Sequence, residues 1–165
     1  MTPQYVIVGG NAAGMSTATR LRRLDETAEI IVLEQGEHVS YASCGLPYHL
    51  SDTVPEENLA VMGVEQLSAA FDLDIRTGVT ATEIDPDAAT VSVVDADGES
   101  MTIAYDDLVV ATGAEPLVPP MFDLDELAHC HTLRTVSDAT DICEEVADAE
   151  RALVIAVGYV GLEVG

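Results

Sequence analysis

The residue best placed to do chemistry is Cys44, which stands in the run Ser-Cys-Gly-Leu-Pro-Tyr at positions 43–48. Pro47 suits the first turn of a helix, where its missing N–H costs nothing, so a short helix is predicted to begin just after Cys44. Helix N-termini favour the thiolate, which is the nucleophile of disulfide exchange. No second cysteine follows nearby, so Cys44 is expected to act in a mixed disulfide with a small thiol or as a sulfenic acid. The alternative is a buried cysteine with a structural role.

Upstream of Cys44, the pattern Gly9-x-Asn11-x-x-Gly14 has the form of a dinucleotide-binding turn. It follows an apolar run and precedes a helical pattern, as the G-x-G-x-x-G fingerprint does, although Asn11 replaces the middle glycine. The glycines permit a tight turn, and the N-terminus of the following helix attracts a pyrophosphate. Glu34 stands 20 residues beyond Gly14, where a carboxylate accepts hydrogen bonds from ribose hydroxyls. A glycine turn with a purely structural role is the alternative.

The elements that must position these residues follow from the hydrophobic pattern. A strand at 5–8, a helix at 13–24 and a strand at 30–34 form one strand-helix-strand unit, so a parallel crossover is predicted. A helix at 64–71 and a strand at 73–77 come next. Three short β-rich runs at 80–84, 90–94 and 101–104 are separated by Asp-Pro-Asp and Asp-Gly turns, and a buried strand follows at 108–111. The predicted fold class is α/β, a Rossmann-like domain whose parallel sheet carries a small antiparallel meander.

The C-terminal part of the chain predicts the beginning of a second unit of the same kind. A proline-rich connector at 115–120 leads to a helix at 138–149, for which Ser137 is the expected N-cap. A strand is predicted at 153–157. It runs into a second turn, Ala156-x-Gly158-x-x-Gly161, in which alanine replaces the first glycine. This pattern indicates the start of another Rossmann-like domain.

Charge is the extreme property of the composition. The chain has 30 acidic and 6 basic residues, for a formal net charge of -24, and every basic residue is arginine. Such a surface repels itself in dilute salt and is screened at molar salt, so a salt-loving cytoplasm is predicted. The charge excludes nucleic acid as a partner. No apolar run of about 20 residues indicates a membrane span, and no secretory signal is visible. Cys130 and Cys143 fit neither a metal site nor a disulfide framework and are interpreted as small hydrophobic residues.

With these motifs in place, the chain resembles the N-terminal part of the pyridine nucleotide-disulfide oxidoreductases that carry a single active-site cysteine. It is most similar to the coenzyme A-disulfide reductases, with NADH oxidases and NADH peroxidases as near relatives. The resemblance rests on the glycine turn, Glu34, the Cys-Gly-Leu-Pro-Tyr run and the stretches at 22–24, 105–113, 132–134 and 158–163. The Cys-Gly-Leu-Pro-Tyr run is specific to this group, whereas the Ala-Thr-Gly run at 111–113 is common to many flavin and nicotinamide enzymes.

The resemblance implies FAD and either NADH or NADPH as cofactors, with a small-molecule disulfide as substrate. FAD would be held by Gly9, Asn11, Ala12, Gly14 and Glu34, with Val79 near the adenine, Ala111, Thr112 and Gly113 closing over the cofactor and Arg134 near the flavin. Tyr159 and Glu163 match positions near the nicotinamide, and coenzyme A would be gripped from Ser16, Arg20, Arg23, Ser40 and Ser43. In the implied reaction NAD(P)H reduces the flavin, which passes electrons to Cys44 in its mixed disulfide with coenzyme A.

A cluster of three arginines bears on this substrate. Arg20, Arg22 and Arg23 are close together in a chain without lysine. Arg20 and Arg23 are three positions apart and share a helix face, which suits a phosphate clamp, while a solvated charge cluster at the helix end is the alternative. Ser43 replaces the asparagine that the family often has, and no lysine occurs at 68–71, so another small thiol, a polysulfide or oxygen stays open as the acceptor.

The resemblance also divides the chain. Residues 1–112 correspond to the N-terminal part of an FAD-binding domain, 113–150 to a connector and helix, and 151–165 to the start of an NAD(P)-binding domain. The family chain continues further and forms homodimers. We therefore expect an incomplete N-terminal piece that is not a competent reductase alone. A nucleotide-binding remnant without turnover, or a half that needs a second chain, is the alternative.

Overall fold

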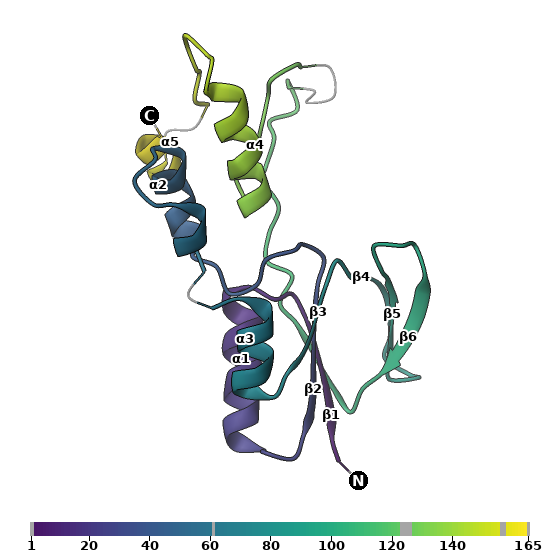
Figure 1. Ribbon diagram of the computed structural model, residues 1–165. Coiled ribbons are helices and arrows are strands. Elements are labelled where there is room, and N and C mark those ends of the chain that lie inside the picture. The colour runs from purple at the N-terminus through teal and green to yellow at the C-terminus, as the bar shows by residue number, and fades with distance from the viewer. Residues whose placement is uncertain (1, 61, 123–126, 156–157, 165) are drawn as a thin grey trace. The chain divides into compact units, whose positions relative to one another are not determined.

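The computed structural model describes residues 2–60, 62–122, 127–155 and 158–164. The chain divides into two compact units, and each is described by itself. The first unit consists of residues 1–41 and 61–113, and the second of residues 42–60 and 114–165. The chain therefore leaves the first unit after its second strand, returns to it, and leaves again after its last strand (Figure 1).

The described residues of the first unit form a four-stranded parallel sheet in the order β3-β2-β1-β7. Its strands are β1 (Gln4–Val8), β2 (Glu29–Glu34), β3 (Asp74–Thr77) and β7 (Asp107–Val110). Helix α1 (Ala12–Leu24) connects β1 to β2, and α3 (Val64–Phe71) precedes β3. The predicted parallel crossover is confirmed, because Val6 pairs with Ile31 of β2 in parallel register. The strand order reverses at β1, which has β2 on one side and β7 on the other.

Both faces of the parallel sheet are buried, which explains its continuous apolar runs. Ile7 and Val32 point to one face, where they pack with Met15 and Ala18 of α1 and Leu67 of α3. The residues next to them along each strand point to the opposite face, where they pack against the antiparallel strands of residues 80–104. This second cluster contains Val6, Val8, Ile31, Leu33, Val91, Val93 and Ile103. The period of two along each strand therefore produces two cores, one on each side of the sheet.

The predicted antiparallel meander is confirmed. It contains β4 (Thr80–Asp85), β5 (Thr90–Val94) and β6 (Ser100–Ala104), paired in that order. In the central strand, Val91 and Val93 are buried while the residues between and beside them are partly exposed. This alternation is typical of a sheet that covers a core with one face only.

The second unit is helical among the residues that are described. A 3₁₀ turn η1 (Ser43–Gly45) leads into α2 (Leu46–Leu50), and a second 3₁₀ turn η2 (Glu56–Asn58) follows. Helices α4 (Val136–Val146) and α5 (Tyr159–Val164) both pack against α2. The ends of the segment that contains α2 are joined, because the N–H of Ala42 donates to the carbonyl oxygen of Leu59 at 2.8 Å.

Two predictions about the C-terminal part were wrong. The N-cap of α4 is Thr135 and not Ser137: the N–H of Asp138 donates to the Thr135 hydroxyl at 3.1 Å, and the Thr135 N–H donates to the Asp138 carboxylate at 2.8 Å. These two reciprocal hydrogen bonds form a capping box, so the helix begins at Val136. Ser137 lies inside the first turn of the helix and does not form this capping box. The predicted strand at 153–157 is also not seen over 153–155, which pair with no strand in the described part of the chain. Positions 156–157, including the first position of the second turn motif, lie outside the described residues.

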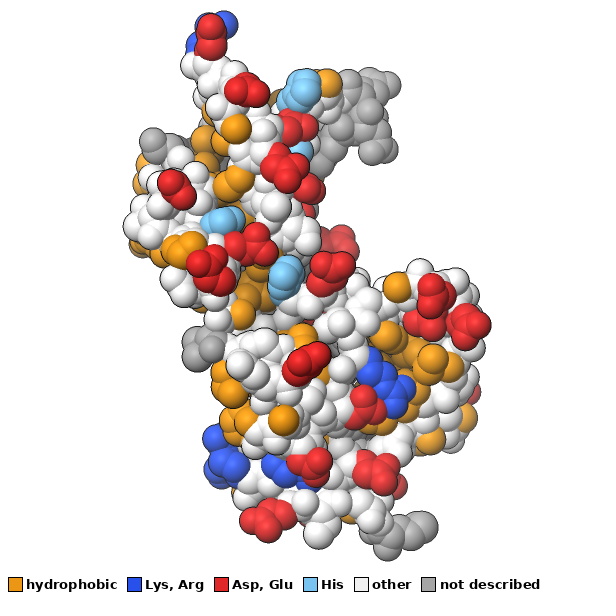
Figure 2. All heavy atoms as spheres, in the orientation of Figure 1, with side chains coloured by type: hydrophobic (Ala, Val, Ile, Leu, Met, Phe, Trp, Pro, Cys, Tyr) orange, Lys and Arg blue, Asp and Glu red, His pale blue; other side chains and the backbone are white. Residues whose placement is uncertain are grey.

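The surface agrees with the composition. Acidic side chains are spread over the face shown in Figure 2, whereas arginines appear at only a few places on it. None of the described helices is long and apolar enough to cross a bilayer.

Candidate functional site

The parallel sheet brings most of the predicted cofactor-binding residues of the first unit to one edge. Gly9 follows β1, Glu34 ends β2, Val79 follows β3, and Ala111 follows β7 directly. Because the carboxyl ends of parallel strands lie at the same edge, these segments meet there. The edge also contains the point where the strand order reverses, which is where open α/β sheets bind their ligands.

The glycine turn leaves no room for a side chain. Gly9 has φ of +106°, and a Cβ built on it would collide with the carbonyl group of Ala111. A Cβ on Gly14 would collide with the carbonyl oxygen of Gly9. The Gly9 N–H donates to the Leu33 carbonyl at 2.8 Å, and the Ala111 N–H donates to the Val8 carbonyl at 2.7 Å. The turn is thus fixed between the ends of β2 and β7, with its backbone packed closely against theirs.

Glu34 connects this turn to the loop that follows β2. Its carboxylate accepts a hydrogen bond from the Gly10 N–H at 2.6 Å and another from the Gly36 N–H at 2.9 Å. An ionised carboxylate offers about four acceptor sites, so capacity remains for two ribose hydroxyls. The sequence predicted Glu34 as a ribose ligand but not its role in holding Gly10 and Gly36. That role depends on the conformation of the loop after β2, which no sequence motif predicts.

The N-terminus of α1 completes the dinucleotide cradle. Asn11 is the N-cap, and the intrahelical ladder starts with the bond from the Met15 N–H to the Asn11 carbonyl at 2.9 Å. The N–H groups of the first turn, which includes Ala12, precede that ladder, and this turn contains no acidic residue. Such an end binds anions through its N–H groups and dipole. The tight glycine turn, the remaining acceptor capacity of Glu34 and this helix end fit a dinucleotide.

The three arginines of α1 differ in their surroundings. Arg22 is largely buried, with 12% of its side chain exposed. Its guanidinium donates to the carbonyl of Phe71 at 3.1 Å and to that of Asp72 at 2.6 Å, so it ties α1 to the end of α3. Arg20 and Arg23 are exposed, as is Ser16. The phosphate clamp of Arg20 and Arg23 therefore stays a prediction, whereas Arg22 between them has a structural role.

Ser40 lies beside the glycine turn of the first unit. Its N–H donates to the Gly10 carbonyl at 2.9 Å. Its φ is +53°, a left-handed conformation that residues other than glycine seldom adopt. Ser40 therefore belongs to the edge where the dinucleotide residues gather, although the sequence indicated it only as a substrate contact.

Cys44 lies in the 3₁₀ turn of the second unit and is exposed. The prediction of a short helix directly after it is confirmed, with Leu46 and Pro47 buried at the start of α2. The exposure of this residue argues against the alternative of a buried structural cysteine. Ser43 beside it is also exposed. Because α2 has only 5 residues, its dipole adds little to the surroundings of the thiol, and the neighbouring side chains matter more.

The other two cysteines are separate from Cys44. All three are free thiols, and Cys130 and Cys143 are partly buried. Burial, together with the charge of Asp52, raises the pKa of the Cys143 thiol. Asp52 comes after α2, whereas Cys44 comes before it. Among the described residues, neither of these cysteines forms a disulfide with Cys44.

The remaining predicted residues, Arg134, Tyr159 and Glu163, lie in the second unit, and hydrogen-bond partners are seen there for Arg134 and Glu163. Arg134 donates from Nε to the Ala114 carbonyl at 2.8 Å, which ties the start of the connector to the N-terminus of α4. Tyr159 is 90% exposed at the start of α5. Glu163 accepts a hydrogen bond from the hydroxyl of Tyr48 at 3.2 Å. Sequence reasoning missed this last contact, because the two residues are 115 positions apart.

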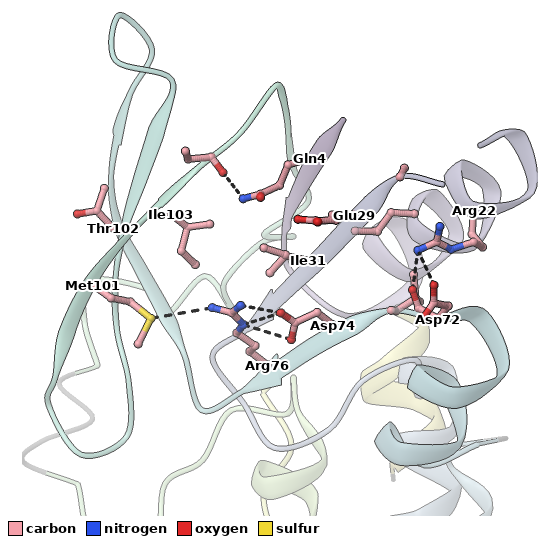
Figure 3. A pocket seen from close by; sticks show the side chains of 14 residues that line it. Gln4, Arg22, Glu29, Ile31, Asp72, Asp74, Arg76, Met101, Thr102 and Ile103 are labelled. Atoms are coloured by element: carbon pink, nitrogen blue, oxygen red, sulfur yellow. Dashed lines mark hydrogen bonds and ion pairs between the residues drawn. The ribbon is translucent and has the colours of Figure 1, made fainter. Parts of the chain in front are cut away.

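A groove of about 680 Å³ lies elsewhere in the first unit (Figure 3). It is lined by Gln4, Glu29 and Asp74, the first residues of β1, β2 and β3, and therefore lies toward the edge of the sheet opposite the glycine turn. Arg76 forms an ion pair with Asp74 of the same strand, at 2.6 Å (Figure 3). None of the predicted site residues lines it. Among the described residues, no cluster of histidine, cysteine or acidic side chains has the geometry of a metal site.

The fold and this edge are those of a Rossmann-like dinucleotide-binding domain. The model of the pyridine nucleotide-disulphide oxidoreductases matches residues 3–165. The chain belongs to this family, whose members use FAD and NAD(P)H.

Individual relatives have several activities. The chain is 37% identical over 160 residues to an NAD(P)H sulfur oxidoreductase (CoA-dependent) of Pyrococcus abyssi, covering 96% of this chain and 35% of that one. It is 32% identical over 166 residues to the coenzyme A disulfide reductase of Staphylococcus haemolyticus, covering 98% and 37%. It is 30% identical over 161 residues to an NADH oxidase of Methanocaldococcus jannaschii, covering 96% and 36%.

A solved structure shows the same fold. Reduced CoADR-RHD of Bacillus anthracis superposes with a TM-score of 0.93 at 37% identity, covering 99% of this chain and 30% of that one. The chain thus spans little more than a third of the length of the curated relatives that it matches.

Proposed function

We propose that this chain carries the FAD-binding turn and the redox-active thiol of an NAD(P)H-dependent disulfide reductase, most specifically a coenzyme A-disulfide reductase. The observation that carries the proposal is the exposed Cys44 shortly before α2, in a chain whose first unit gathers Gly9, Glu34 and Ala111 at one edge of its parallel sheet. The similarity to a coenzyme A disulfide reductase and to a CoA-dependent sulfur oxidoreductase supports this choice of substrate.

The first unit would hold the FAD. The N–H groups at the start of α1 would bind the pyrophosphate, and Glu34 would accept hydrogen bonds from the ribose hydroxyls. Val79 would contact the adenine through its backbone, whose N–H donates to the Glu34 carbonyl at 3.0 Å. Residues 111–113 would close over the cofactor. When bound, FAD would supply two electrons taken as hydride from NAD(P)H.

Cys44 would perform the exchange with the substrate. Its thiolate attacks one sulfur of the disulfide, which forms a mixed disulfide and releases the other half as a thiolate. Two electrons then break the mixed disulfide, which regenerates the thiolate of Cys44 and releases the second half of the substrate as a thiolate. Two protons are taken up as the two released thiolates become thiols. A single cysteine suffices for this cycle, because the substrate itself supplies the second sulfur.

The phosphates of coenzyme A would be bound by arginine. Ser16, Arg20 and Arg23 lie on the exposed surface of α1. Among the described residues, neither of these two arginines has an acidic partner in an ion pair. In a chain with a net charge of -24, two unpaired guanidinium groups on one helix suit a phosphate-bearing ligand. Ser40 and Ser43 are proposed as further contacts.

A second candidate is an NADH oxidase or peroxidase. In this case Cys44 attacks a peroxide oxygen, becomes a sulfenic acid and releases water or hydroxide. The similarity to an NADH oxidase favours it. A third outcome is a chain that binds FAD or another nucleotide without turnover.

The decisive experiment is a visible spectrum of the protein purified in molar KCl, recorded before and after anaerobic addition of NADH. We expect a flavin band that bleaches with NADH and returns on adding coenzyme A disulfide. Return with oxygen but not with the disulfide would favour the oxidase. The matched variant is Cys44→Ser, which should keep the flavin band and lose disulfide reduction. A flavin that NADH does not bleach would point to nucleotide binding alone.

The proposal extends to the whole protein. We propose that residues 1–112, 113–150 and 151–165 are parts of a longer chain that forms a homodimer. Arg134 near the flavin, and Tyr159 and Glu163 near the nicotinamide, belong to the same proposal. We further propose that the protein works in a salt-rich cytoplasm, on the basis of its charge.

A further inference from the structure

The groove of the first unit lies where the meander and the parallel sheet face each other (Figure 3). Every second side chain along the parallel strands faces the meander, as the second core cluster shows. Gln4 and Glu29 belong to this set by their spacing, and Asp74 joins it because it pairs with Ile31 in parallel register. Strand β6 borders the groove through residues 101–104. The groove is therefore lined by both layers of the fold, away from the dinucleotide edge.

One edge of β6 has no neighbouring strand in the described part of the chain, because β6 ends the order of the meander. The Tyr105 N–H donates to the Ala89 carbonyl at 3.0 Å, on the side of β5. The Ala104 carbonyl accepts a hydrogen bond from the Gln4 side chain at 2.6 Å, on the other side. Main-chain groups in an antiparallel strand alternate between its two sides, and the N–H and C=O of one residue point the same way. Thr102 therefore presents both groups to the free edge.

The free edge of β6 and the groove are continuous, because Thr102 and Ala104 also line the groove. An unpaired strand edge beside a groove is the arrangement to which an extended peptide adds as a further strand. Main-chain hydrogen bonds give such an addition its affinity, and alternate side chains of the added segment enter the groove. The groove volume of about 680 Å³ is within the range of small-ligand sites.

The lining of the groove suits side chains with an apolar stem and a cationic end. Its apolar part includes Ile31 and Ile103, each 7% exposed. The guanidinium of Arg76 is already paired with Asp74 at 2.6 Å. Glu29 is exposed and has no ion-pair partner among the described residues. A lysine or arginine would cover the apolar part with its methylene groups and bring its charge to Glu29.

We propose that the free edge of β6 binds an extended basic segment of another protein, as an added strand whose lysine or arginine side chains enter the groove. The net charge of -24 attracts basic segments to this surface, and the same charge disfavours a second copy of this chain as the occupant. The inference goes beyond the proposed function. None of the residues proposed to hold FAD or to exchange disulfides lines the groove, so either proposal can fail without the other.

The test measures the fluorescence anisotropy of a labelled Ser-Lys-Thr-Lys-Thr-Lys-Ser peptide during titration with the full chain. KCl is varied from the lowest concentration at which circular dichroism shows a folded chain up to molar. Two further probes separate the contributions to binding. One has glutamate in place of each lysine, and the other keeps the lysines but carries methyl groups on its backbone nitrogens. The methylated probe has lost its main-chain donors and has kept its charge.

The protein variants address the same two contributions. Thr102→Pro removes the N–H that faces the free edge, a change that strands tolerate on an unpaired side. Its matched control is Thr102→Val, which keeps this N–H. Glu29→Gln removes the unpaired carboxylate of the groove. Glu144→Gln, on the exposed surface of α4, is the control for a carboxylate lost elsewhere.

The lysine probe should bind, and the glutamate probe should not. Thr102→Pro should weaken binding by about two- to tenfold, as expected for one main-chain hydrogen bond, and methylation of the probe should weaken it at least as much. Glu29→Gln should weaken binding by about two- to fivefold at the lowest KCl concentration, and this difference should shrink as salt screens the charges. Thr102→Val and Glu144→Gln should leave the Kd unchanged.

Several results would overturn the proposal. Equal binding of the methylated and unmodified lysine probes, or no binding of either, would leave only general attraction to an acidic surface. Equal Kd values for Thr102→Pro and Thr102→Val would exclude the β6 edge. If Thr102→Pro does not fold, the methylated probe decides alone. Sedimentation velocity without a probe covers the remaining occupant: a dimer that Thr102→Pro dissociates would assign the edge to a second copy of the chain and overturn the proposal.

Discussion

Gly9→Ala tests the claim that the glycine turn is fixed by steric contact. Alanine at φ of +106° is strained, which costs about 1–3 kcal/mol. Its Cβ would also stand 2.7 Å from the carbonyl carbon of Ala111, and relieving this contact would break the hydrogen bond from Ala111 to Val8, at about 1 kcal/mol. We expect a loss of about 3 kcal/mol in the free energy of unfolding, a large share of the roughly 5–15 kcal/mol of a typical domain.

The matched control is Gly98→Ala. Gly98 has φ of +82°, and a Cβ built there meets nothing within 4 Å, so only the conformational cost of about 1–2 kcal/mol applies. The assay is urea unfolding in molar KCl, followed by far-ultraviolet circular dichroism. A difference of less than about 0.5 kcal/mol between the free energies of unfolding of the two variants would refute the reasoning. The close approach of the ends of β1 and β7 would then not contribute to the cost of the substitution.

The other predictions concern helix ends, charge and pH. Arg22→Met should lower the free energy of unfolding by about 1–3 kcal/mol through its lost carbonyl contacts, whereas the exposed Arg23→Met should change it by less than about 0.5 kcal/mol; urea unfolding distinguishes them. Thr135→Ala should cost about 1 kcal/mol in the same assay and Ser137→Ala almost nothing, because Thr135 is the cap. Two histidine hydrogen bonds lower the pKa of Glu145 below its ordinary value of 4.5, so their stabilisation is present above that pH and is lost as the pH falls through the lowered value. In thermal melts the disadvantage of Glu145→Gln should therefore shrink on acidification, and a constant difference would contradict this. The melting temperature should rise between dilute and molar KCl, since salt screens a net charge of -24. A melting temperature that does not rise with the KCl concentration would exclude the prediction of a salt-rich cytoplasm.

The sequence predicted the first unit well because its signals are local and repeated. Alternation along each strand and the long amphipathic pattern of α1 predict elements without knowledge of their partners. The helix predicted at 64–71 matches α3, Val64–Phe71. The glycine turn and Glu34 were predictable as well, since a fixed spacing places them at the carboxyl ends of adjacent strands.

The failures share a physical cause, which is dependence on distant or reciprocal contacts. Ser137 and Thr135 are both good cap residues, and only the returning bond from Asp138 decides between them. The apolar run at 153–155 has the composition of a strand but no described strand to pair with. Arg22 resembles its two neighbours in sequence, yet two of its carbonyl partners belong to Phe71 and Asp72, 49 and 50 positions further along the chain. No local pattern contains this information.

The hydrogen bond between Ala42 and Leu59 has a consequence for how this family can diversify. It joins the two ends of the segment 42–59, which carries Cys44. The parallel sheet is built entirely from residues outside this segment. A segment closed in this way can be replaced without changing the residues that form the sheet. Its length, its thiol and its helix can be exchanged while the sheet and its nucleotide edge keep their register. Changes within this segment can therefore arise without disturbing the packing of the parallel sheet.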